Sequence, residues 1–184
     1  MDDRAVTLAS SDFGLFDVPQ QFAQDRAVLD ARWKALQREA HPDKFSTQQA
    51  SAQRLAMQWS VRINEAYQRL KDPLKRAAYL CELAGVRVNA ENNTAMPAQF
   101  LMQQMEWREA LDAATSSAAA EALQAEMLQE KRAVLQRCEE LLDQQHDPVQ
   151  AVGQVRALMF IERFCTDIEA RLEHFESLPA ATSD

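Results

Sequence analysis

The chain has 184 residues, of which 47% are hydrophobic, and a formal net charge of −8. Only three glycines and six prolines interrupt it, and its frequent alanine, leucine, glutamine, glutamate and arginine favour helix. No apolar run approaches the length of a membrane span, and the acidic first residues resemble neither a secretory signal nor a transit peptide. We therefore expect an all-α protein of one or two domains that works in the cytoplasm, where it is made, without membrane contact.

The cysteines are scattered and contain no C-x-x-C pair. An odd number without regular spacing favours a reducing compartment over a disulfide framework. Cys81, Cys138 and Cys165 each lie in an apolar helical context, where free cysteine packs as a small hydrophobic side chain. A three-cysteine zinc site is a minor alternative, so we expect neither a metal nor a cofactor.

The first half predicts two helices joined by a loop that contains a proline. Residues 25–40 place apolar side chains along one helix face, namely Leu29, Trp33, Leu36 and Ala40. Proline disfavours helical geometry in the residue before it, so this helix is expected to end near His41. A second helical stretch ends at residues 63–70, which makes His41, Pro42 and Asp43 the exposed tip of an antiparallel hairpin.

A third helix should follow directly, with Asp72 as its N-cap and Pro73 as its first residue. Gly85 is a plausible C-cap for this helix, and the asparagine-rich run after it predicts a turn or loop.

With its flanks, the tripeptide His41-Pro42-Asp43 resembles the J-domain, the module that docks on DnaK-type ATPase chaperones and stimulates their ATP hydrolysis. The flanks that match are a Phe-Leu entry at residues 13–19, Asn64, and a D-P-x-x-R-x-x-Y stretch at residues 72–79. Ala40 departs from the pattern, because J-domains usually carry an aromatic residue there. The alternative is an ordinary proline turn, since a tripeptide alone occurs by chance in many chains.

Charge divides unevenly between the halves of the chain. Residues 1–78 hold 12 Lys/Arg and 10 Asp/Glu, giving +2, and residues 79–184 hold 8 and 18, giving −10. The basic residues next to the tripeptide are Arg26, Arg32, Lys34, Arg38 and Lys44. They form either a solvated helix face or a patch that fits an acidic groove on a protein partner and steers its approach, and the adjacent tripeptide favours the patch. Nucleic acid is disfavoured, because the excess is small and the second half would repel phosphate.

The second half predicts three helices, at residues 97–114, 117–145 and 148–176. Pro97 is expected at the first position of its helix, and Asp147 as the N-cap before Pro148. Short connections predict an antiparallel three-helix bundle, in which the last helix contributes a core stripe of Ile161, Phe164, Ile168, Leu172 and Phe175. We expect domains at residues 12–84 and 97–176, with residues 85–96 as a linker.

The helix at residues 97–114 carries more apolar residues than one buried stripe requires. At 100° per residue, the core stripe comprises Phe100, Trp107, Leu111 and Ala114. Leu101, Met102 and Met105 fall on the far side with Glu106 and Glu109. They either pack on another part of the chain or form an exposed patch for a protein partner, a use for which flexible methionines are suited.

The segment F-L-M-Q-Q-M-E-W-R-E-A-L-D resembles the signature of HscB-type J-proteins, co-chaperones of iron–sulfur cluster assembly, and the resemblance extends from Asp12 to Phe175. It implies an N-terminal J-domain and a C-terminal three-helix bundle. It also implies two partners, an HscA-type ATPase chaperone and an IscU-type scaffold protein. For the ATPase, the resemblance implies His41, Pro42 and Asp43, to which the basic patch adds Arg32, Lys34, Arg38 and Lys44. Those implied for the scaffold are Leu101, Met102, Met105, Glu106, Glu109 and Phe160.

Two other functions fit parts of the sequence. A general J-protein that delivers unfolded clients would predict a Gly/Phe-rich linker or a C-x-x-C zinc module, and the sequence contains neither. An enzyme could use His41 and Asp43 as base and orienting acid. However, the proline between them points the two side chains apart, and no second catalytic cluster accompanies them. We therefore expect a co-chaperone without catalytic activity of its own.

Overall fold

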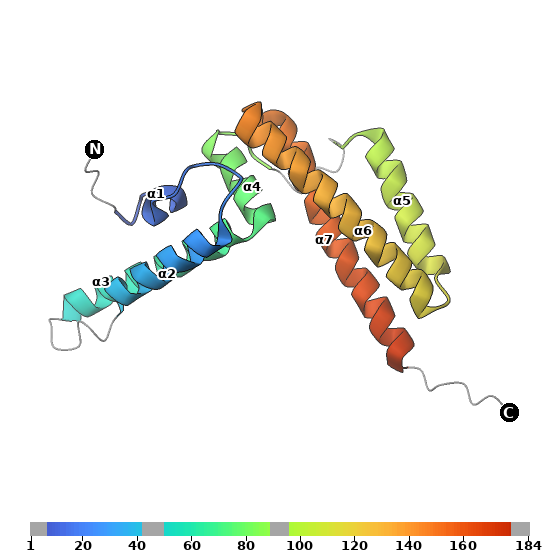
Figure 1. The fold of residues 1–184 in the computed structure, drawn as a ribbon, viewed down its shortest axis with the longest axis horizontal. Coiled ribbons are helices and arrows are strands. Elements are labelled where there is room, and N and C mark those ends of the chain that lie inside the picture. The colour runs from blue at the N-terminus through green and yellow to red at the C-terminus, as the bar shows by residue number, and fades with distance from the viewer. Residues whose placement is uncertain (1–6, 42–49, 89–95, 178–184) are drawn as a thin grey trace.

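The computed structural model describes residues 7–41, 50–88 and 96–177 of the chain. These residues form no β-strand. Seven α-helices follow one another within them: α1 (Asp12–Phe16), α2 (Arg26–Ala40), α3 (Ala50–Lys71), α4 (Pro73–Leu83), α5 (Ala98–Ala113), α6 (Ser117–Glu139) and α7 (Pro148–Ser177). Between α6 and α7 lies a π-helical turn, η3 (Glu140–Gln144). Figure 1 shows the hairpin of α2 and α3 and the bundle of α5, α6 and α7 as two arms that diverge from the region of α4.

The helix starts follow from local side-chain chemistry. The carboxylate of Asp25 accepts the N–H groups of the first turn of α2, and Asp72 does the same for α4, which begins at Pro73. Asp147 accepts the N–H of Gln150 at 2.9 Å at the start of α7. The starts at Asp72 and Asp147 confirm the predicted N-caps, and Asp25 is a further one, because a capping carboxylate satisfies donors that the helix leaves free.

Two helix boundaries differ from the prediction. Pro97 is the N-cap of α5 rather than its first residue, because its backbone is extended, with φ −55° and ψ 138°. The stretch expected as one helix from 117 to 145 leaves α-helical geometry at Glu140 and widens into η3, where the N–H of Gln145 donates to the carbonyl of Glu140.

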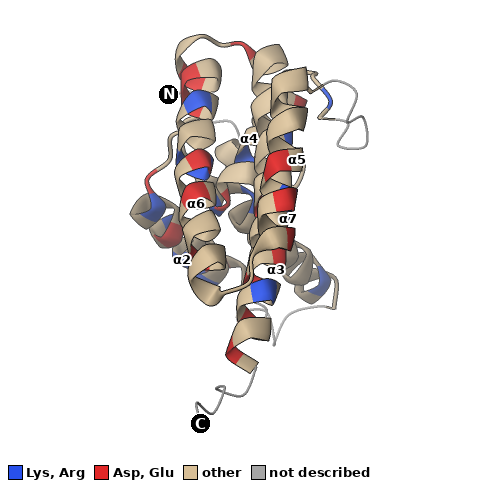
Figure 2. Cartoon of the chain, turned by 90° about the vertical axis from the view of Figure 1, so that its right-hand side faces the viewer, with Lys and Arg blue, Asp and Glu red and all other residues tan. Residues whose placement is uncertain are grey.

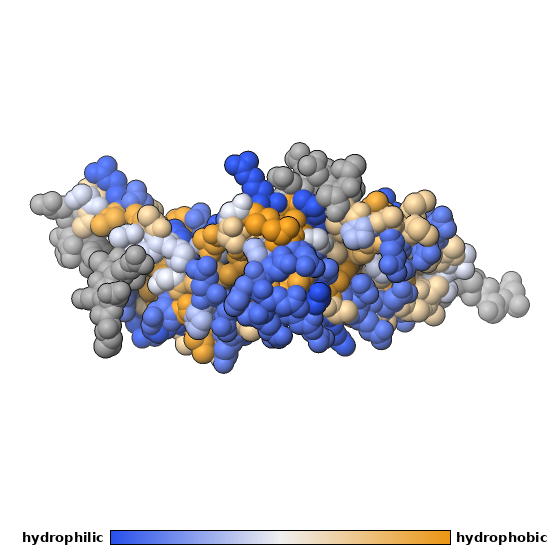
Figure 3. Space-filling view, turned by 90° about the horizontal axis from the view of Figure 1, so that it is seen from above, coloured by the Kyte–Doolittle hydropathy of each residue, from blue (hydrophilic) through white to orange (hydrophobic). Residues whose placement is uncertain are grey.

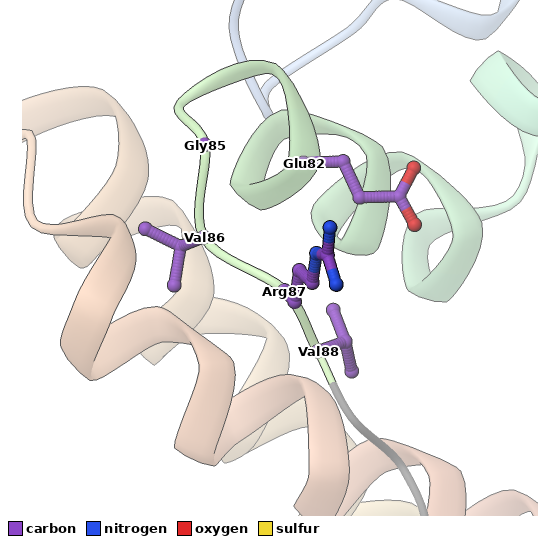
Figure 4. A pocket seen from close by; sticks show the side chains of 5 residues that line it. All are labelled: Glu82, Gly85, Val86, Arg87 and Val88. Atoms are coloured by element: carbon purple, nitrogen blue, oxygen red, sulfur yellow. The ribbon is translucent and has the colours of Figure 1, made fainter.

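Helix α4 ends at a glycine, as predicted. Gly85 has φ +79°, and the N–H groups of Gly85 and Val86 donate to the carbonyls of Glu82 and Cys81, both at 2.9 Å. This is the Schellman arrangement, which satisfies the last carbonyls of a helix. Figure 4 shows the chain leaving α4 here, with Val86 directed toward the bundle and Arg87 on the side of Glu82. The expected asparagine-rich loop lies outside the described residues.

A buried carboxylate fastens α1 to the rest of the N-terminal half. Asp12 is fully buried and pairs with Arg62 at 2.6 Å and with Arg69 at 3.0 Å, both on α3. Its own N–H donates to the hydroxyl of Tyr79 on α4 at 3.0 Å. If α1 moved away, the buried carboxylate of Asp12 or its arginine partners would lose their compensating charge, which is strongly destabilising. The network therefore holds α1 across α3 and α4.

One apolar core extends through both halves of the molecule. It joins Phe13 and Phe16 of α1 and Leu70 of α3 to Cys138 of α6 and Leu158 of α7, and α4 packs directly against α7. A smaller cluster holds the far end of the bundle together. The domain boundaries at 12–84, 85–96 and 97–176 stay a prediction, since the buried core is continuous between the two halves.

Two glycines provide a matched test of backbone conformation. Gly153 lies inside α7 with open space where a Cβ would be, so Gly153→Ala should raise the free energy of unfolding by about 0.4–1 kcal/mol. Gly85→Ala should lower it, because alanine is strained at positive φ. Urea unfolding monitored by circular dichroism measures both changes. A destabilised Gly153→Ala would show that this position needs close backbone approach.

Candidate partner-binding sites

The tip of the hairpin begins where the sequence predicts it. Helix α2 ends at Ala40, and His41 follows with an extended backbone and an exposed side chain. Pro42, Asp43 and Lys44 lie outside the described residues. The extended geometry of His41 agrees with the restriction that a following proline imposes.

The basic residues of α2 divide into two groups. Arg32 donates to the carboxylate of Asp17 at 2.5 Å, so its charge is already partly matched within the chain. Lys34 and Arg38 are exposed, and the structure describes no ion pair for either. Lys34 lies close enough to Asp30 to help lower the pKa of that carboxyl, and both side chains remain accessible.

A polar and aromatic network, which the sequence did not single out as a unit, holds α2 against α3. The ring of Trp33 stacks on Tyr67 with 4.9 Å between centroids, and its Nε1–H donates to Asn64 Oδ1 at 2.9 Å. The hydroxyl of Tyr67 donates to Asp30 at 2.7 Å, which lowers the pKa of Asp30 and raises that of Tyr67. The network, which includes Asn64, therefore holds α2 alongside α3 in the hairpin.

Beside the hairpin tip lies an apolar hollow of about 460 Å³. Ala40, Leu36, Leu55, Trp59 and Ile63 are among its lining residues. Ala40, which departs from the J-domain pattern in having no aromatic ring, borders this hollow. Elsewhere, the face seen in Figure 3 shows apolar patches between larger hydrophilic areas, one of them near the middle of the view.

Helix α5 buries one stripe and exposes another. Trp107 is 4% exposed, donates its Nε1–H to Glu126 of α6 at 2.7 Å, and packs in the smaller core cluster near Phe100. Ala114 is also buried, and Leu111 is half-buried against the same cluster. The core stripe predicted from the sequence is confirmed.

The opposite side of α5 is open to solvent. Met102 and Met105 are each 63% exposed, and Glu106 and Glu109 beside them are exposed too. We call these four residues the outer face of α5. Figure 2 shows acidic residues along α5 and α7 on the side of the bundle that faces the viewer. An unbranched, adaptable methionine pair beside carboxylates is chemistry suited to protein recognition.

Two residues expected with this face are more buried than expected. Leu101 is half-buried and packs against the main core, so only its outer part borders the face. Phe160 of α7 stacks between Trp107, at 6.0 Å, and Phe164, at 5.6 Å, while the guanidinium of Arg108 lies 5.7 Å from its ring centroid. Periodicity within one helix could not reveal this aromatic stack, because the stack depends on how α5 and α7 pack together.

The cysteines behave as the sequence predicted. Cys81 and Cys138 are buried and Cys165 is partly buried, all with free thiols. Burial raises the pKa of Cys81 to about 11 and that of Cys138 to about 12, so both stay protonated near neutral pH. Over the described parts of the chain, no group of three or more His, Cys, Asp or Glu side chains could hold a metal ion. The same residues contain no helix that is both long and apolar enough to cross a membrane.

A further hollow, of about 610 Å³, lies beside the end of α4. It is lined by Glu82 and the four residues that follow Ala84, Gly85 to Val88 (Figure 4). Since it offers one acidic and one basic side chain and no converging set of polar groups, we do not assign it a ligand.

Comparison with known proteins places this geometry in a family. Residues 96–169 match a family model described as the HSCB C-terminal oligomerisation domain. The chain is 51% identical to a co-chaperone protein HscB homolog of Burkholderia multivorans over 175 residues, which covers 94% of this chain and 99% of that protein. The homolog from Burkholderia cenocepacia is 49% identical with the same coverage.

Solved structures agree with the sequence comparisons. The chaperone HscB from Vibrio cholerae has a TM-score of 0.80 at 35% identity and covers 90% of this chain and 99% of its own. The human co-chaperone protein HscB has a TM-score of 0.86 at 27% identity and covers 91% and 84%. The fold is thus that of a J-type co-chaperone, all-α, with an N-terminal J-domain and a C-terminal helical domain. The chain belongs to the HscB family of co-chaperones.

The exposure of the outer face predicts how its truncation affects stability. Met102→Ala with Met105→Ala should change the melting midpoint little, because substitutions at exposed positions usually cost less than about 0.5 kcal/mol. Trp107→Ala, on the buried side of the same helix, should cost about 3–5 kcal/mol. Thermal unfolding of the two variants beside the parent makes the comparison. An early-melting methionine variant would mean that these side chains support the core.

Proposed function

We propose that this co-chaperone binds an IscU-type iron–sulfur scaffold protein through the outer face of α5 and presents it to an HscA-type ATPase chaperone through the hairpin tip. The ATPase is stimulated to hydrolyse ATP, holds the scaffold and so promotes transfer of the cluster that the scaffold carries. The protein itself catalyses no reaction. The cytoplasm is the compartment in which we place this activity.

The observation that carries the proposal is the exposure of Met102 and Met105, each 63%, on a helix whose core stripe is already buried. Leu101 and Phe160 are half-buried, and we propose that their exposed parts also meet the scaffold, while Glu106 and Glu109 supply charge beside the methionines. A small apolar centre with a charged rim is the usual composition of a protein–protein contact. The net charge of −10 over residues 79–184 favours a scaffold surface that is basic or neutral.

The opposite charge balance supports a different partner for the N-terminal half. Lys34 and Arg38 are exposed on α2, which leads to His41, and they favour an acidic groove on the ATPase. Exposed charges of this kind act mainly on the encounter rate and register. The contact assigned to His41, Pro42, Asp43 and Lys44 then adds the specific docking.

Affinity for each partner need only be modest. When one protein carries both contacts, the second binding event occurs within a complex that has already formed, and the effective concentration of that partner is raised. A dedicated scaffold carrier therefore does not need the deep client-binding surface of a general chaperone.

A double dissociation tests the proposal. His41→Gln should abolish stimulation of ATP hydrolysis by an HscA-type chaperone while leaving the dissociation constant for an IscU-type scaffold unchanged, because the tip and α5 are separate surfaces. Met102→Ala with Met105→Ala should do the reverse, weakening scaffold binding by at least about tenfold if the pair contributes about 1.4 kcal/mol. ATPase assays and calorimetric titration measure the two effects. Loss of both activities in either variant would contradict separate sites.

A further inference from the structure

The contact between the two halves has a polar fastening at its edge. Asp143 in η3 accepts the backbone N–H of Phe22 at 2.6 Å through Oδ1 and that of Ala23 at 2.8 Å through Oδ2. Phe22 and Ala23 belong to the loop between α1 and α2, about 120 residues away in the sequence. Both carboxylate oxygens are thus engaged by the segment that leads directly into the basic helix of the hairpin.

The surrounding contacts hold this loop in place. Phe22 is 5% exposed, and the guanidinium of Arg76 on α4 lies 5.0 Å from its ring centroid. Arg76 is itself buried and donates to the carbonyl of Leu70. Burial lowers the pKa of Arg76, and the nearby charges of Asp72 and Asp143 oppose that effect. Asp143 therefore supports the loop in two ways. It accepts the backbone N–H groups of Phe22 and Ala23, and its charge favours the Arg76 cation that covers Phe22.

Asp143 lies in the π-helical turn. A π-helical turn is wider than an α-helical one and is frequently found at functional sites. It begins at Glu140, directly after α6, and Leu141 within it remains buried in the core. The irregular turn thus keeps one side chain in the core and turns another toward the J-domain.

We propose that Asp143 is a positioning residue that couples scaffold binding to stimulation of the ATPase, an inference that rests on the function proposed above. The outer face of α5 and the hairpin tip lie on different arms, so both partners can meet productively only if the arms keep one relative orientation. The apolar packing of α4 on α7 holds the arms together but is not directional. The paired hydrogen bonds from Asp143 add the direction, since hydrogen bonds weaken steeply when misaligned.

Asp143→Asn is the sharpest test, because the side chain keeps its shape but one acceptor oxygen becomes an N–H₂ donor that faces a backbone N–H. We expect unchanged ATPase stimulation without scaffold and an unchanged dissociation constant for the scaffold. The additional stimulation that the scaffold brings should fall toward the level without scaffold. Asp167→Asn, at an exposed position on α7, removes the same charge away from the contact and should retain the full effect.

Amide hydrogen exchange measures the contact independently of either partner. Asp143→Asn should lose protection at Phe22 or Ala23 while circular dichroism shows a folded chain. Asp143→Glu, which keeps two acceptor oxygens on a longer arm, is expected to fold and to couple more weakly than the parent, and replaces Asp143→Asn if that variant does not fold. Lost protection with full coupling would overturn the inference, as would retained protection. A parent protein that gives no stimulation at all would instead overturn the proposed function and leave the exchange result to judge the contact.

Discussion

Helix α4 lies between the two halves of the molecule. Its packing against α7 sets how the arm with the hairpin is placed relative to the arm with the bundle, and so how far apart the two candidate sites lie. Ala77 and Cys81 of α4 are fully buried, and the Cys81 thiol contacts the carbonyl of Pro148 at the start of α7, 3.7 Å away. Arg156 of α7 donates to the carbonyl of Val88 at 2.8 Å, which also fastens the chain after α4. A protein that carries two partners, as proposed here, needs such a connection more than it needs a deep pocket.

Each arm uses a different means to expose the residues proposed to meet a partner. In the J-domain, the polar network around Tyr67 and the stack of Trp33 on Tyr67 hold one face of α2 against α3, so Lys34 and Arg38 can remain at the surface. In the bundle, Trp107 and the guanidinium of Arg171, which donates to the carbonyls of Leu111 and Asp112, hold α5 by one side and by its end. The methionines can stay exposed because the helix is already anchored.

Much of this arrangement was predictable from the sequence, for a physical reason. Caps such as Asp72 with Pro73, and the stripe that includes Trp107, depend on neighbours within a few residues. The half-burial of Leu101, the stack that encloses Phe160 and the contact of Asp143 with Phe22 depend on packing between distant segments, which periodicity does not contain. The turn at Glu140 was missed because the composition of residues 117–145 is that of an uninterrupted helix.

We propose that two separate surfaces on one molecule serve two partners at the same time. Hydrogen–deuterium exchange of the full chain, followed by mass spectrometry with an IscU-type scaffold, an HscA-type ATPase, and both together, tests it most directly. The account predicts protection of α5 by the scaffold alone, protection of α2 and the segment after it by the ATPase alone, and the sum of both patterns in the ternary mixture. Protection of α5 by the ATPase, or loss of one pattern when the second partner is added, would contradict it.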